Sequence, residues 1–116
     1  MNKKLTWGFS GREATKENVV ACVGNGWHHI VAKLIDDLFD LGWDGCVLQV
    51  KEKFGGLRFY ICAGNQPIWD RIREAEQESY KTCEVCGESG VLRTDGWMKT
   101  LCEEHGAGRP TEHPSI

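Results

Sequence analysis

The feature that most constrains this chain is a set of four metal-binding side chains in its C-terminal third. Cys83 and Cys86 are separated by two residues, and Cys102 and His105 repeat that spacing after fifteen intervening residues. Two-residue spacing lets both side chains of a pair bind one ion, and Gly87 follows where the chain must turn sharply. Three thiolates and one imidazole fill a tetrahedron. We therefore predict one structural Zn²⁺ with no ligand position left for substrate.

A redox-active Cys83–Cys86 pair is an alternative, but it calls for alternating strands and crossover helices, which this sequence lacks. Between the ligand pairs, Asp95 and Gly96 form a strong turn dipeptide flanked by short β-prone segments. A knuckle, a hairpin and a second ligand pair follow one another. This order resembles a zinc ribbon, or a treble-clef module if Cys102 opens a helical turn.

Hydrophobic periodicity upstream of the ligands predicts two helices. Residues 26–42 are expected to form the first helix, with Gly42 as a left-handed C-terminal cap. Residues 67–80 are expected to form the second, with Pro67 in its first turn. Its buried stripe is predicted to contain Ile68, Ile72, Ala75 and Ser79.

A β-hairpin is predicted between these helices, in the sequence CVLQVKEKFGGLRFYICA. If Gly55 and Gly56 form a two-residue loop, Phe54 lies opposite Leu57 and alternation assigns the two faces. The core face is then expected to hold Leu48, Val50, Phe54, Leu57, Phe59 and Ile61, with Glu52 as its one polar member. The outer face is expected to show Gln49, Lys51, Lys53, Arg58, Tyr60 and Cys62.

These elements predict an α+β fold in which a helix, a hairpin and a helix form a core at residues 26–81. The zinc module occupies residues 82–105. Residues 1–25 are expected to add a strand or a short helix, with residues 18–23 as a candidate third strand. Residues 106–116 are expected to be a frayed tail. We interpret Cys22, Cys46 and Cys62 as small buried residues in or beside strands.

Composition narrows the class of protein. A hydrophobic content of 41% suits one compact domain, and no segment has the apolar length of a secretory signal or a membrane span. We therefore expect a cytoplasmic protein, in which disulfides are rare. The formal net charge is −3, and three thiolates with one Zn²⁺ would make it one unit more negative. That balance disfavours general attraction to nucleic acid.

A local surface on the outer face of the hairpin remains a candidate for partner binding. Lys51, Lys53 and Arg58 lie beside Tyr60 there, and we call these four residues the basic face. A solvated sheet face, a protein-binding surface and a nucleic-acid-binding surface are the three interpretations, because cations neutralise phosphates and an exposed ring can stack on a base. The spacings of zinc deaminases and zincins are missing, and no histidine lies between the two ligand pairs as a treble-clef nuclease would require.

The hairpin and ligand motifs together resemble a group of small, poorly characterised zinc-ribbon proteins encoded by bacteria, phages and prophages. The resemblance covers roughly residues 26–105. It implies a non-catalytic accessory protein that binds a bacterial protein, as an inhibitor of host defence or a modifier of transcription. A nucleic-acid-binding zinc protein that uses the basic face is the first alternative, and a metal-dependent nuclease is the second.

Overall fold

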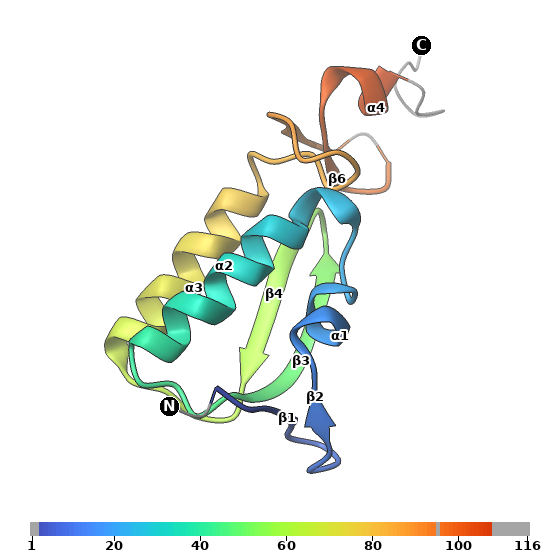
Figure 1. Cartoon of the computed structure of the whole chain (residues 1–116). Helices are drawn as coiled ribbons and strands as arrows, with labels where there is room; N and C mark the ends of the chain where they lie inside the picture. The colour runs from blue at the N-terminus through green and yellow to red at the C-terminus, as the bar shows by residue number, and fades with distance from the viewer. Residues whose placement is uncertain (1–2, 95, 108–116) are drawn as a thin grey trace.

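The computed structural model describes residues 3–94 and 96–107, which form a mixed α+β fold with two sheets. A four-stranded sheet and two long helices make the core. A two-stranded sheet and a short helix lie at the other end of the hairpin from the first strands, and the Cys and His ligands lie in the loops beside that sheet and in that helix (Figure 1). The predicted α+β class is therefore confirmed. No helix among the described residues has the length and apolar content needed to cross a bilayer.

The N-terminal segment contributes both strands and a helix. β1 (Leu5–Trp7) pairs antiparallel with β2 (Glu13–Ala14) and parallel with β3 (Cys46–Lys53). With β4 (Gly56–Ile61) beside β3, the strand order is β2-β1-β3-β4. The prediction of a strand at residues 18–23 is wrong. Those residues contain the end of helix α1 (Lys16–Val20), whose first turn is capped by the Thr15 hydroxyl, which accepts a hydrogen bond from the Asn18 amide.

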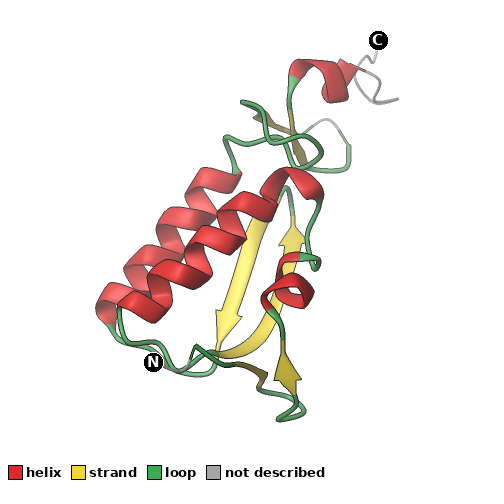
Figure 2. Ribbon diagram, viewed as in Figure 1, coloured by secondary structure: helices red, strands yellow, loops and turns green. Residues whose placement is uncertain are grey.

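Two long helices cover one face of the hairpin. A short 3₁₀ turn, η1 (Asn25–Trp27), leads into α2 (His28–Asp40), which ends beside Gly42 in the predicted left-handed conformation. α3 (Gln66–Ser79) begins at Asn65, whose side chain accepts a hydrogen bond from the Ile68 amide. The two helices lie side by side over β3 and β4 (Figure 2). The four residues predicted for the α3 stripe are all buried.

The hairpin register differs from the prediction at its tip. Lys53 pairs with Gly56, so the two-residue loop is Phe54–Gly55, and Phe54 has a left-handed φ of 54°. A bulge between Val47 and Gln49 shifts the other end. Val47 is consequently buried, whereas Leu48 is exposed.

These changes affect only part of the predicted core face. Val50, Leu57, Phe59 and Ile61 are buried as expected, but Leu48 and Phe54 are exposed by 43% and 61%. The middle of the hairpin therefore follows simple alternation, whereas the tip and the bulged end do not. We had not predicted that Phe54 would occupy a turn position that normally favours glycine or asparagine.

The exposed edge of the sheet is covered by polar side chains of α3. β4 is one of the two edge strands of the four-stranded sheet, and its Leu57 amide donates to the Ser79 hydroxyl at 2.9 Å. The Phe59 amide donates to a Glu76 carboxylate oxygen at 3.2 Å. An unpaired edge is a template for aggregation, so these two hydrogen bonds explain why Ser79 lies within an otherwise apolar stripe.

The three cysteines outside the ligand set do not behave as buried thiols. Cys46 and Cys62 form a disulfide with a Cα–Cα distance of 5.6 Å, which joins β3 to the residue after β4. Cys22 is exposed and free. The earlier interpretation failed because the hairpin brings Cys46 and Cys62 opposite each other, a proximity that their separation in sequence does not reveal.

The C-terminal elements begin directly after α3. β5 (Val91–Arg93) and β6 (Lys99–Leu101) form an antiparallel pair, and α4 (Glu103–Ala107) follows. Residues 106 and 107 thus belong to a helix, not to the expected tail. Residues 108–116 and Asp95, half of the predicted turn dipeptide, lie outside the described residues.

The left-handed Phe54 generates a test of the hairpin. Phe54→Asn creates an Asn-Gly loop suited to positive φ at both positions, so it should stabilise the protein by about 1 kcal/mol. Thermal unfolding would then shift upward by roughly 5 °C. Phe9→Asn is the matched control, because Phe9 is also exposed but has no positive φ. A fall in stability with Phe54→Asn would show that the ring contributes more than its conformation costs.

Candidate metal centre

The four predicted ligands come together at one point. One sulfur or nitrogen atom from each of Cys83, Cys86, Cys102 and His105 lies within 4.8 Å of the others. The Cys86 and Cys102 sulfurs are 3.7 Å apart, and the Cys83 sulfur is 3.6 Å from His105 Nδ1. The Cys102 sulfur is 3.2 Å from the same nitrogen. These residues are therefore positioned to hold a metal ion.

The separations fit tetrahedral coordination. Bond lengths of about 2.3 Å for Zn–S and about 2.0–2.1 Å for Zn–N place neighbouring ligands about 3.8 Å apart for two sulfurs and about 3.6 Å for sulfur and nitrogen. Two of the three closest separations agree with those values, and the Cys102–His105 separation is shorter by about 0.4 Å. Thiolate and imidazole donors suit Zn²⁺ well, so the donor chemistry and the spacing agree.

Local backbone structure aims each ligand. The Gly87 amide donates to the Cys83 carbonyl at 2.9 Å, and Gly87 has a φ of 86°, so the first pair lies on a tight glycine turn. The second pair spans the end of β6 and the start of α4, where the His105 amide donates to the Cys102 sulfur at 3.4 Å. The resulting order is a knuckle, a hairpin and a second ligand pair, of which Cys102 immediately precedes α4 and His105 lies within it.

The surroundings favour the thiolate form of Cys83 but disfavour that of Cys86. Burial raises the pKa of the Cys83 thiol, but hydrogen bonds from backbone amides such as those of Cys102 and Cys86 outweigh burial and lower the pKa to about 6. A hydrogen bond from the Glu88 amide lowers the pKa of the Cys86 thiol. Burial and the neighbouring sulfurs outweigh this effect and raise the pKa to about 11. A bound cation would favour the thiolate form of Cys86, which its raised pKa otherwise disfavours.

The histidine ligand is influenced by the same sulfurs. Hydrogen bonding to Cys102, and then to Cys83, raises the pKa of the His105 imidazole. Without a metal ion, a positive imidazole would offset part of the thiolate charge, and a metal ion must displace that proton to bind Nδ1. Metal binding at this cluster is therefore expected to weaken as the pH falls.

The metal knuckle packs directly on the start of α2. The Gly26 amide donates to the Glu84 carbonyl at 2.9 Å, and the Trp27 indole donates to the Thr82 carbonyl at 2.8 Å. A Cβ at Gly26 would overlap the Cys83 carbonyl oxygen. Only glycine permits this approach, so the knuckle and the core form a continuous packed structure at this point.

A second connection joins β6 to the hairpin tip. The Thr100 hydroxyl is buried and donates to the Gly55 carbonyl at 2.6 Å. Lys99 lies between two carboxylates, 3.3 Å from Glu52 and 3.2 Å from Glu84. Glu52 also accepts a hydrogen bond from the Gly55 amide at 2.7 Å. Glu52, the one polar residue of the predicted core face, thus helps to anchor residues 82–105, which we call the metal module.

The four residues of the predicted basic face differ in how available they are to a partner. Lys53 and Tyr60 are exposed and Lys51 is half-buried, and the cross-strand pairing of Lys51 with Arg58 places those two on the same side of the sheet. Arg58, however, is half-buried, and its Nη1 donates to the Tyr80 hydroxyl at 3.2 Å and to the Leu57 carbonyl at 3.1 Å. Lys51 and Lys53 therefore remain the more available cations.

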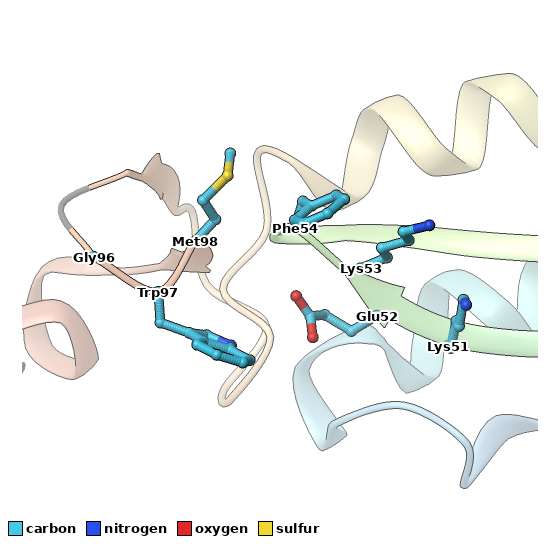
Figure 3. A pocket seen from close by; sticks show the side chains of 7 residues that line it. All are labelled: Lys51, Glu52, Lys53, Phe54, Gly96, Trp97 and Met98. Atoms are coloured by element: carbon cyan, nitrogen blue, oxygen red, sulfur yellow. The ribbon is translucent and has the colours of Figure 1, made fainter.

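A groove that sequence reasoning missed lies between the hairpin tip and the metal module. It has a volume of about 470 Å³, and we call it the tip groove. Its walls are formed by Lys51, Glu52, Lys53 and Phe54 on one side and by Gly96, Trp97 and Met98 on the other (Figure 3). The only sequence signal was the apolar pair Trp97–Met98 after a predicted turn, where polar residues are the norm.

No protein-family model, no curated protein and no solved structure matches this chain. The resemblance to small zinc-ribbon proteins of phages and prophages therefore stays a prediction.

The geometry predicts which thiol is essential for metal binding. Metal analysis of the purified protein should find about one Zn²⁺ per chain, and Cys86→Ser should reduce this strongly because one ligand of four is lost. Cys22→Ser should retain the metal, because Cys22 is exposed and outside the cluster. Equal metal content in both variants would contradict the assignment.

Proposed function

We propose that this chain is a non-catalytic binding protein that one structural Zn²⁺ stabilises. The observation that carries the proposal is the convergence of four protein ligands, because a complete tetrahedron leaves no position for water or substrate on the ion. Structural zinc sites of this kind contribute directly to folding. The role of the ion is then to hold a shape.

The shape that it holds supports a binding function. The ligand-bearing segments also carry the residues that contact the hairpin tip, namely Lys99 and Thr100, and Glu84 pairs with Lys99. Next to this junction lie two of the most exposed large apolar side chains, Phe54 and Trp97. Exposed aromatic residues beside a groove are typical of protein-interaction surfaces.

The specific version of the proposal concerns the partner. We propose a bacterial protein as the partner and a phage or prophage accessory protein as the context, with inhibition of host defence or modification of transcription as the biological roles. This version rests on the sequence resemblance alone. A cytoplasmic location belongs with this version of the proposal. The Cys46–Cys62 disulfide argues against that location, because oxidising compartments maintain disulfides more readily.

Metal removal should separate a structural role from a catalytic one. Apparent metal affinities in zinc-finger peptides are roughly 10 to 16 kcal/mol, which is large beside the total stability of a small domain. We expect a chelator or Cys86→Ser to lower the thermal midpoint by roughly 10 °C or more, since a loss of about 2 kcal/mol suffices.

The partner is tested by capture from a bacterial lysate followed by binding of the purified pair. Metal-loaded protein should retain one bacterial protein, and Cys86→Ser should not. Lys51→Glu with Lys53→Glu should keep the melting temperature but weaken the pair, if the partner uses these cations. Metal-dependent cleavage of DNA or RNA by the loaded protein, lost in Cys86→Ser without a change in melting, would overturn the proposal in favour of a nuclease.

A further inference from the structure

The tip groove combines apolar walls with cations. Trp97 and Met98 face the hairpin tip across the groove, whereas the Lys51 and Lys53 side chains extend from the hairpin (Figure 3). Its volume of about 470 Å³ is in the range that accommodates a small molecule or a short peptide segment.

The hairpin maintains an unfavourable conformation at this groove. Phe54 has a φ of 54°, in the left-handed region that costs an ordinary L-residue roughly 1–2 kcal/mol. The ring is 61% exposed, so little burial offsets that cost. In the two-residue loop Phe54–Gly55, asparagine or glycine would suit the first position better than phenylalanine does. Strain of this kind concentrates at functional sites, which supports a role for the Phe54 ring.

The charges in the groove are not balanced internally. Neither Lys51 nor Lys53 forms an ion pair with any of the residues that the structure describes, and the Lys53 ammonium lies 5.5 Å from the centre of the Phe54 ring. Among the described residues that line the groove, Glu52 is the only acid, and it is already bound by Lys99 and by the Gly55 amide. The groove therefore presents unpaired positive charge beside exposed aromatic surface.

We infer that the tip groove binds a short acidic peptide segment of a partner protein, with one large apolar side chain seated between Phe54, Trp97 and Met98. The peptide carboxylates pair with Lys51 and Lys53. This inference rests on the proposed binding function and names the surface and the partner chemistry. Aromatic anchors with a charged rim are the usual source of affinity in such contacts.

A single-stranded nucleic acid is the competing ligand, and the charges favour the peptide. Nucleic-acid grooves line up cations along a phosphate backbone, but here only two lysines are available and Arg58 is turned toward Tyr80. Glu52 and Glu84 lie next to Lys99, and the chain as a whole carries a net charge of −3. These negative charges would repel phosphates more than they would a peptide that carries one or two carboxylates.

Selection from a library of random ten-residue displayed peptides, with the metal-loaded full chain as bait, tests the inference. Enriched peptides should contain an aromatic or large aliphatic residue with Asp or Glu within a few positions. Trp97→Ala should weaken these peptides at least tenfold, whereas Trp69→Ala, an exposed tryptophan on α3, should not. Phe54→Asn should also weaken them without lowering the melting temperature.

The charge pairing has its own control. Lys51→Glu with Lys53→Glu should weaken acidic peptides at least tenfold, and Arg12→Glu with Lys81→Glu, which changes net charge equally outside the groove, should not. The inference is overturned if no peptide is enriched, if the enriched peptides lack acids, if the groove variants bind them normally, or if a labelled oligothymidine displaces them. Peptides that bind equally well to the groove variants would exclude the tip groove as the binding site while leaving the proposed binding function intact.

Discussion

Three sulfurs and one imidazole nitrogen meet within 4.8 Å at one end of this molecule, and the raised pKa of Cys86 disfavours a third thiolate there unless a cation is bound. The position of the metal module depends on this constraint. Its hairpin has only three residues in each strand, which is too little to be stable in water alone. We propose that a bound metal ion supplies the missing stability, and the close packing of Gly26 against Cys83 and Glu84 joins the ligand-bearing segment to the start of α2.

The same constraint builds the surface that we propose for binding. Lys99 and Thr100 lie in β6. Lys99 pairs with Glu52 and Thr100 donates to the Gly55 carbonyl, so these two residues fix the metal module against the hairpin tip. The tip groove lies at this junction, so its two walls come from parts of the chain that only the metal module brings together. In the function that we propose, a zinc ion without an open ligand position acts through shape, because side chains away from the ion make the contacts with the partner.

Local patterns in the sequence predicted the two long helices and the hairpin between them but not β1, β2 or α1, and contacts between distant residues were not predictable. Spacing identified the four ligands, and periodicity identified α2, α3 and the buried middle of the hairpin. The loop at Phe54–Gly55 was missed because Gly55–Gly56 is the better turn on intrinsic preference, and tertiary contacts with Tyr80 at Gly56 and with Thr100 at Gly55 override it. The disulfide and the groove were missed for the related reason that each depends on a register or a docking that no short segment encodes.

Residue-resolved amide hydrogen exchange, with the metal bound and after chelation, tests the central claim most directly. Removing the metal should abolish protection at the amides that the knuckle fixes, those of Glu84, Gly87 and Gly90, and at Gly26, which donates to Glu84. Core amides of α2 and the hairpin, such as those of Leu34 and Phe59, should stay protected. Unchanged protection at the knuckle after chelation, with complete metal loss verified, would contradict the claim that the metal holds this end of the molecule together.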